Sequence, residues 1–150
     1  METPTQIAEV KLVYSTKVKP SDRKKINTSK EAYAILLHTW DVETIELHEE
    51  VKILLLNNAN RVLGVYSVSK GGVTGAIADP KLIFSAALKA HATGIILAHN
   101  HPSGNLQPSQ ADINLTRKCK QAGELLEIKL LDHVIISTEG HYSFADEGTI

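Results

Sequence analysis

The chain has 150 residues, of which 43% are hydrophobic, and its 16 basic and 17 acidic side chains leave a net charge of −1. This length and composition can fill one hydrophobic core, so we expect a single domain. The near-neutral charge lacks the basic excess that is typical of nucleic-acid-binding proteins. The single cysteine, Cys119, excludes an intrachain disulfide and a cysteine-based zinc site, and it favours a reducing compartment.

The N-terminal residues lack the basic start and apolar stretch of a signal peptide, and no apolar run approaches the length of a membrane span. We therefore predict a cytoplasmic protein that does not cross a membrane. Residues 17–25 hold a local group of basic side chains, but the Pro, Ser and Asp among them favour a solvated linker.

The first half of the chain predicts one helix and several strands. Residues 9–15 alternate enough for a marginal edge strand, which could pair with a second copy of the chain as a homodimer. Thr28 and Glu31 form a capping-box pattern before a short amphipathic helix that continues to about His38. Two strands are expected at 51–56 and 62–69, joined by a tight turn, and a further extended piece near 73–78.

Two helices are predicted in the second half. Asp79 before a proline marks the start of the first helix, which we expect to end at Gly94. The second helix is predicted from Ser109 to about Ala122, closed by Gly123.

Apolar residues at 126–137 predict one last long strand or a pair of strands. Strands and helices mixed in this order predict an α/β fold with a mixed sheet flanked by helices. We divide the chain into an N-terminal extension with a short helix, residues 1–40, and a main domain, residues 41–150.

His99, His101 and Asp112 stand close together in the run AHNHPSGNLQPSQADINL. The apolar residues before His99 and the Pro-Ser-Gly after His101 predict a strand that ends here, and alternate residues of a strand point to the same side. Asp112 falls in the first turn of the next predicted helix. Two imidazoles and a carboxylate form the ligand set of an open catalytic zinc site. Asp112 also fits a capping box with Ser109, and both interpretations can hold together.

A zinc hydrolase also needs a general base, for which a nearby carboxylate is suited. The candidates on this chain are Glu43, Glu46, Glu49, Glu50, Glu124 and Glu127. Strand parity puts Glu49 on the face of Val51 and Ile53, and it puts Glu50 on the opposite face. Spacing alone does not choose between the two.

The spacing of these residues resembles a known signature. His99-x-His101, followed by seven residues, Ser109, two residues and Asp112, is similar to the JAMM motif of the JAB/MPN metalloproteases. Four segments resemble the RadC-like bacterial JAB domain: SKGG at 69–72, AHNHPSG at 98–104, PSQAD at 108–112 and LLDH at 130–133. The resemblance covers roughly residues 47–146.

The resemblance implies a JAB/MPN-like (cytidine-deaminase-like) fold and a zinc-dependent hydrolase that cleaves a peptide or isopeptide bond with metal-activated water. It implies that His99, His101 and Asp112 bind Zn²⁺. It also implies that Ser109 stabilises the oxyanion of the reaction, and that an upstream glutamate is the general acid and base.

The family pattern, counted back from Asn57, selects Glu49 as this glutamate. Val51 stands where the family usually has an aromatic residue and Asn57 where it has an aspartate, so Glu50 stays an alternative.

Other functions stay open. One is a binding module of the same fold without catalytic turnover. Another is a role in DNA repair, which the family label alone suggests. RadC-like proteins usually carry an N-terminal helix-hairpin-helix segment, and the residues ahead of the predicted domain are too few to contain one. The expected partner is therefore a peptide or protein substrate of unknown identity.

Four further residues have structural or supporting interpretations. Asn100 points away from the predicted ligand face and could stabilise a loop by hydrogen bonding. Asp132 and His133 lie in a strand that looks buried, which favours a structural or ligand-supporting hydrogen bond over metal binding. Cys119 lies among apolar residues of the second predicted helix and is expected to be a packing residue.

Overall fold

The computed structural model describes residues 6–71 and 78–150 as an α/β domain built on a five-stranded sheet, which confirms the predicted fold class. The strands run in the order β2-β1-β3-β4-β5. Their bounds are β1 Glu50–Leu56, β2 Val62–Lys70, β3 Gly94–Asn100, β4 Lys129–Ile136 and β5 His141–Ser143. The sheet is mixed, because β3 and β4 are parallel whereas the other neighbours are antiparallel.

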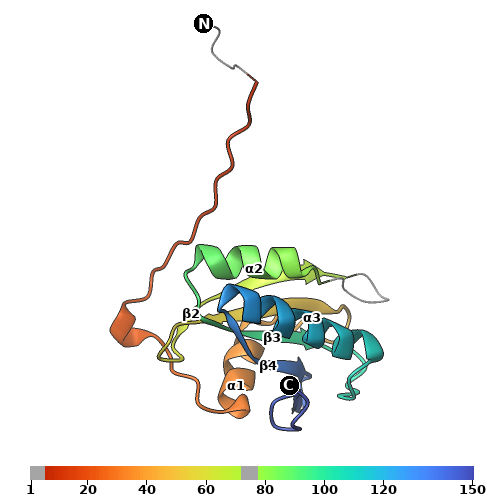
Figure 1. Ribbon diagram of the computed structural model, residues 1–150. Helices are drawn as coiled ribbons and strands as arrows, with labels where there is room; N and C mark the ends of the chain where they lie inside the picture. The colour runs from red at the N-terminus through yellow and green to blue at the C-terminus, as the bar shows by residue number, and fades with distance from the viewer. Residues whose placement is uncertain (1–5, 72–77) are drawn as a thin grey trace, which may run out of the picture.

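Three α-helices cover the sheet: α1 (Ser29–Thr39), α2 (Pro80–Lys89) and α3 (Gln110–Leu126), and a short 3₁₀ turn, η1 (Pro20–Asp22), precedes them. Helices α2 and α3 lie on one face and α1 lies on the other (Figure 1). None of the helices in the described part of the chain has the length and apolar character needed to cross a bilayer.

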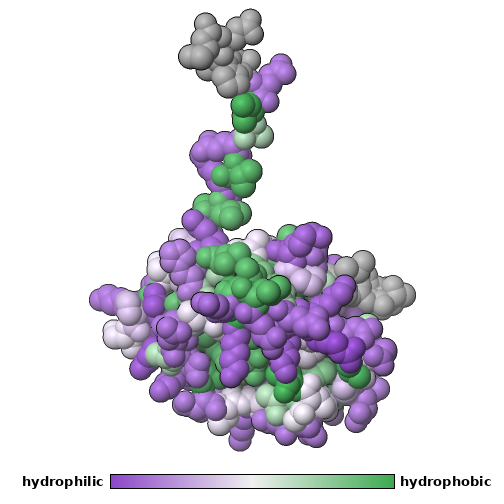
Figure 2. All heavy atoms as spheres, viewed as in Figure 1, coloured by the Kyte–Doolittle hydropathy of each residue, from purple (hydrophilic) through white to green (hydrophobic). Residues whose placement is uncertain are grey.

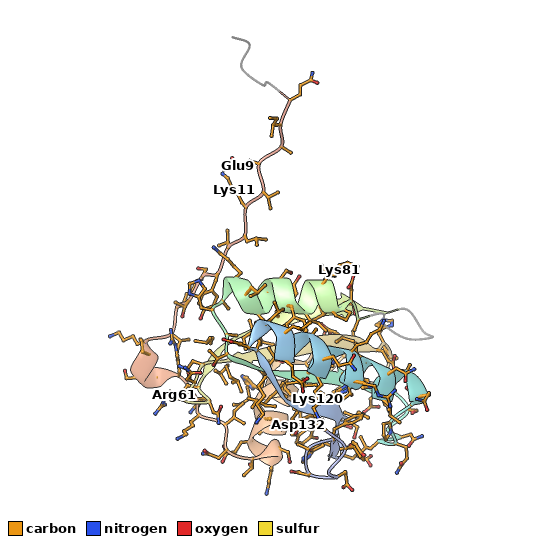
Figure 3. The ribbon with its side chains drawn as sticks, viewed as in Figure 1. Glu9, Lys11, Arg61, Lys81, Lys120 and Asp132 are labelled. Atoms are coloured by element: carbon orange, nitrogen blue, oxygen red, sulfur yellow. The ribbon has the colours of Figure 1, made fainter. Side chains whose placement is uncertain are left out.

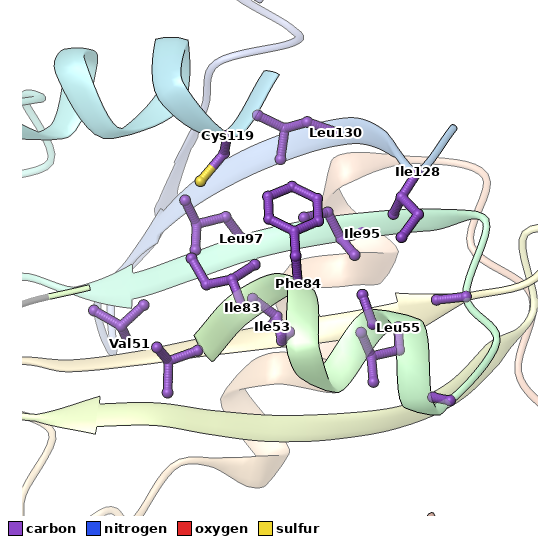
Figure 4. Packing of buried hydrophobic residues seen from close by; sticks show 14 residues of the cluster. Val51, Ile53, Leu55, Ile83, Phe84, Ile95, Leu97, Cys119, Ile128 and Leu130 are labelled. Carbon is purple, nitrogen blue, oxygen red and sulfur yellow. The ribbon is translucent and has the colours of Figure 1, made fainter. Parts of the chain in front are cut away.

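Each face of the sheet carries its own hydrophobic cluster. The cluster beneath α2 and α3 (Figure 4) contains Val51, Ile53, Leu55, Val68, Ile83, Phe84, Ala87, Ala90, Ala92, Ile95, Leu97, Cys119, Ile128 and Leu130. The cluster beneath α1 contains Ile26, Ala32, Leu36, Trp40, Ile45, Leu54, Leu56, Ile96, Ala98, Val134 and Ile136. Alternate residues of β1 and β3 divide between the two, as strand parity predicts. Cys119 is buried in the first cluster and has the packing position expected for it.

The register between β1 and β3 determines where the functional residues lie. Val51 of β1 pairs with His99 of β3, so both lie on the α2/α3 face. Glu49 comes two residues before Val51, just ahead of β1, and shares its parity. Glu50 has the opposite parity and faces the α1 side.

Two glycines predicted to end helices have other roles. Helix α2 already ends at Lys89, and Gly94 is the first residue of β3. Helix α3 continues through Gly123 and ends at Leu126, and Glu127 caps it with a left-handed φ of 56°. A Cβ on Gly123 would lie 2.1 Å from the carbonyl oxygen of Ile128, so this glycine permits close contact between α3 and the chain entering β4.

The edge strand predicted at 9–15 is wrong: this segment has no strand conformation and projects from the domain (Figure 1). Apolar side chains lie along it in full view (Figure 2), and Val10 is 84% exposed. Glu9 and Lys11 pair only loosely there, at 4.0 Å (Figure 3). Tyr14 contacts the domain by donating a hydrogen bond to the carbonyl of Leu63 in β2. Alternation favoured a strand, but no strand among the described residues pairs with this segment.

The extended piece predicted near 73–78 falls almost wholly on residues 72–77, which lie outside the described residues.

Candidate metal centre

Three side chains converge where β3 ends and α3 begins. His99 belongs to β3, His101 follows it directly, and Asp112 lies in the first turn of α3. The Nε2 atoms of the two histidines are 2.9 Å apart. The Asp112 carboxylate reaches both rings, with Oδ1 3.1 Å from Nε2 of His99 and Oδ2 3.2 Å from Nε2 of His101. The structure therefore brings together the three residues that the motif singles out.

The spacing of these atoms fits a metal ion. Ligand atoms bound to tetrahedral zinc at ~2.0–2.1 Å are themselves about 3.3 Å apart, close to the 2.9–3.2 Å found here. One ligand atom from each residue lies within 4.8 Å of the others. His99 is buried, while His101 and Asp112 are partly exposed. The cluster could hold a metal ion with one side open to solvent.

The far nitrogen of each ring has a hydrogen-bond partner, as is usual for metal-binding histidines. Nδ1 of His101 lies 2.5 Å from the carbonyl oxygen of Asn105. A carbonyl only accepts, so Nδ1 of His101 carries a proton, and in the neutral ring Nε2 keeps a lone pair. Nδ1 of His99 lies 2.8 Å from Nε2 of the buried His133.

Asp112 has two roles at once, as its sequence position indicated. Its backbone N–H donates to Oγ of Ser109, and its carboxylate accepts from the backbone N–H of Ser109, which completes a capping box. The same carboxylate faces both histidines. Burial raises the pKa of Asp112, but the facing rings of His101 and His99 outweigh burial and hold the pKa well below its usual range. The nearby Asp112 carboxylate in turn raises the pKa of His101.

The two candidate bases, Glu49 and Glu50, lie in different surroundings. Oε1 of Glu49 is 4.0 Å from Nε2 of His101, at the partly exposed side of the cluster. Glu50 is buried on the other face, where Oε1 accepts a hydrogen bond from Ser67 and lies 3.8 Å from the Lys52 ammonium. Of these two carboxylates, the geometry favours Glu49 as the group that can reach a water at the cluster.

Asn100 anchors the segment that carries Glu49. Its side chain is fully buried, and its Oδ1 accepts from the backbone N–H of Glu50 at 2.7 Å. Its amide Nδ2 donates to the carbonyls of Ile45 and His48, both at 2.7 Å. Asn100 stands between His99 and His101 in the sequence, so its hydrogen bonds connect the end of β3 to the segment just before β1. The loop-supporting role predicted for it corresponds to these three bonds.

The Asp132–His133 pair also supports its surroundings. Asp132 of β4 (Figure 3) accepts hydrogen bonds from Ser143, Ala145 and the backbone N–H of His133. Burial raises the pKa of Asp132 and outweighs these hydrogen bonds, which act to lower it. His133 instead lies 2.8 Å from Nδ1 of His99, which is the ligand-supporting kind of hydrogen bond predicted for this pair.

Thr116 is the residue that sequence reasoning missed. Its hydroxyl lies 2.6 Å from Nδ1 of His133 and donates to the backbone carbonyl of Asp112. A threonine four residues after a candidate ligand on a helix shares the ligand's face, and that spacing was the available signal.

A family model described as the RadC-like JAB domain matches residues 26–149 of the chain. The chain belongs to this family. The match includes α1, which packs against the sheet through Ala32 and Leu36. It also includes each of the five residues that the sequence singles out for metal binding and catalysis: Glu49, His99, His101, Ser109 and Asp112.

Curated relatives of this RadC-like JAB domain carry names without a stated activity. A "UPF0758 protein" of Flavobacterium johnsoniae is 51% identical over 126 residues, which cover 83% of this chain and 53% of that protein. A protein of the same name from Porphyromonas gingivalis is 47% identical over 103 residues, covering 68% of this chain and 45% of its own length. The chain thus spans about half the length of these relatives.

Proposed function

We propose that this protein is a zinc-dependent hydrolase of the JAMM type, which cleaves a peptide or isopeptide bond. The convergence of His99, His101 and Asp112 at one partly exposed point, with the Glu49 carboxylate beside it, carries the proposal. Membership of a JAB family, whose domains are generally hydrolase-like, supports it.

His99, His101 and Asp112 would hold the zinc ion, which, when bound, supplies Lewis acidity and lowers the pKa of water. Glu49 takes the proton of the attacking water and passes it to the leaving amine, as a general base and then a general acid. Its carboxylate lies 4.0 Å from Nε2 of His101. At this distance it can contact a water molecule beside the proposed ligand atoms.

Ser109 stabilises the negative charge that develops on the carbonyl oxygen under attack. Its hydroxyl oxygen already accepts the backbone N–H of Asp112 at 3.1 Å. Because a hydroxyl can donate one proton while it accepts, the capping bond leaves that proton available for donation to the oxyanion. The capping bond fixes the position of the hydroxyl oxygen at the start of α3.

The test compares zinc-loaded wild type with Glu49→Gln and with the matched control Glu50→Gln. The probes are internally quenched peptides and lysine-linked isopeptides, incubated in ¹⁸O water and analysed by mass spectrometry. Glu49→Gln should retain zinc and lose about 10²–10⁴-fold in turnover. Glu50→Gln preserves an acceptor for Ser67 and should remain within a few-fold of wild type.

Turnover that survives in Glu49→Gln contradicts the assignment of the base. A zinc-loaded wild type that hydrolyses none of these bonds favours the binding module over the hydrolase.

A further inference from the structure

A continuous line of buried hydrogen bonds joins two of the proposed metal ligands behind the cluster. It begins at Nδ1 of His99, which lies 2.8 Å from Nε2 of His133. Nδ1 of His133 is 2.6 Å from the hydroxyl of Thr116. That hydroxyl is 2.8 Å from the backbone carbonyl of Asp112. The line runs from β3 through β4 to α3, where it ends with Thr116 and Asp112, so it joins three elements of the fold.

We propose that His133 and Thr116 are positioning residues that fix the tautomer of His99 and lock its ring to the helix that carries Asp112. This inference rests on the proposed function, because it assigns these residues to the same metal site. Neither residue faces the open side of the cluster: both are buried, with His133 at 0% and Thr116 at 4% exposure.

The acceptor at one end of the line determines which group donates in each of its hydrogen bonds. The carbonyl of Asp112 can only accept, so the single hydroxyl proton of Thr116 lies on that bond. The hydroxyl oxygen of Thr116 must then accept from Nδ1 of His133. A neutral imidazole with a proton on Nδ1 has a lone pair on Nε2, and this lone pair accepts from Nδ1 of His99.

His99 is therefore held with its proton on Nδ1. Its Nε2 lone pair points toward His101 and Asp112, which is the form that a metal ion requires. Without these hydrogen bonds, either ring nitrogen of neutral His99 could carry the proton. The tautomer with its proton on Nε2 has no lone pair there and could not bind the metal through that atom.

Packing fixes the His133 ring in the same orientation. The Phe144 ring is stacked on it, with centroids 4.6 Å apart and planes at 6°. Residue 133 also pairs with Leu97 in the parallel ladder between β3 and β4, two residues before His99. The ring has little freedom to turn, so its two nitrogens keep their separate partners.

The first measurement is the zinc dissociation constant, determined by competition with a chromophoric chelator. Thr116→Val removes the hydroxyl at nearly constant volume and should weaken zinc binding about 10–100-fold. Thr116→Ser restores the hydroxyl and should recover most of the affinity. Thr39→Val is the matched control, because the Thr39 hydroxyl donates to the Leu36 carbonyl on α1, which lies on the opposite face of the sheet from α3.

The second measurement is the ¹⁵N spectrum of the histidine rings in the zinc-free protein. The wild type should show His99 protonated on Nδ1, and Thr116→Val should show a mixture of tautomers. His133→Gln is a second variant at the middle of the line, with the same expected loss of affinity.

Equal zinc affinity in wild type and folded Thr116→Val overturns the proposal, even if Thr116→Val is less stable to urea. So does a wild-type His99 with its proton on Nε2. A wild type that binds no zinc contradicts the proposed function instead, and the tautomer of His99 still decides the hydrogen-bond line by itself.

Discussion

Truncation of Asn100 tests how the fold holds the proposed base. Asn100→Ala removes three buried hydrogen bonds and leaves the Glu50 N–H and the carbonyls of Ile45 and His48 without this partner. Each such group costs about 1–3 kcal/mol when it stays unsatisfied. Water that enters the space left by the side chain offsets part of this cost, so we expect a loss of about 3–5 kcal/mol in the free energy of unfolding. A domain of this size is stable by only about 5–15 kcal/mol in total.

Urea denaturation measures this loss, with the fluorescence of the single tryptophan as the signal. Trp40 is 4% exposed in the α1 cluster, so unfolding changes its surroundings. The exposed Asn58→Ala is the control and should shift the free energy of unfolding by less than about 0.5 kcal/mol. Because the approach to β1 carries Glu49, turnover by folded Asn100→Ala should fall as well. A loss below about 1 kcal/mol would refute the three-bond account.

Two other predictions concern α3. Gly123→Ala places a Cβ 2.1 Å from the Ile128 carbonyl oxygen, so the free energy of unfolding should fall by about 1–3 kcal/mol or more in urea titrations. Gly64→Ala, whose nearest contact is an ordinary 3.7 Å, should cost less, and equal effects would contradict the close approach. Burial raises the pKa of Cys119 from 9.0 to about 11, so at pH 8 the native thiol should react with an aromatic disulfide at least about a hundredfold more slowly than in urea. Equal rates would show that the thiol is accessible.

The cluster of candidate metal ligands was predictable because its signal is local. His99 and His101 need only an extended backbone to converge, and the apolar run before them supplied that information. Asp112 follows within one loop, at the start of a helix whose cap was visible in the sequence. Strand parity likewise predicted that Glu49 and Glu50 face opposite sides of the sheet.

The errors and omissions come from contacts between distant segments. The alternation at 9–15 cannot reveal whether a neighbouring strand exists. In the sequence Gly123 is typical of a helix end, but in the structure it lies inside α3, where the close carbonyl oxygen of Ile128 leaves no room for a Cβ. His133 and Thr116 lie 17 residues apart, and only the packing of β4 against α3 brings them together behind His99. The sequence contained both residues but no measure of that distance.

Elemental analysis of the purified, zinc-loaded protein after removal of loose ions tests the central claim most directly. Wild type and the exposed-carboxylate control Asp22→Ala should retain about one zinc per chain. Asp112→Ala should lose it, and so should Asp112→Asn, which preserves an oxygen acceptor for the Ser109 N–H and therefore separates metal binding from helix capping. Absence of zinc from the wild type, or equal zinc in the Asp112 variants, would contradict the proposed metal centre.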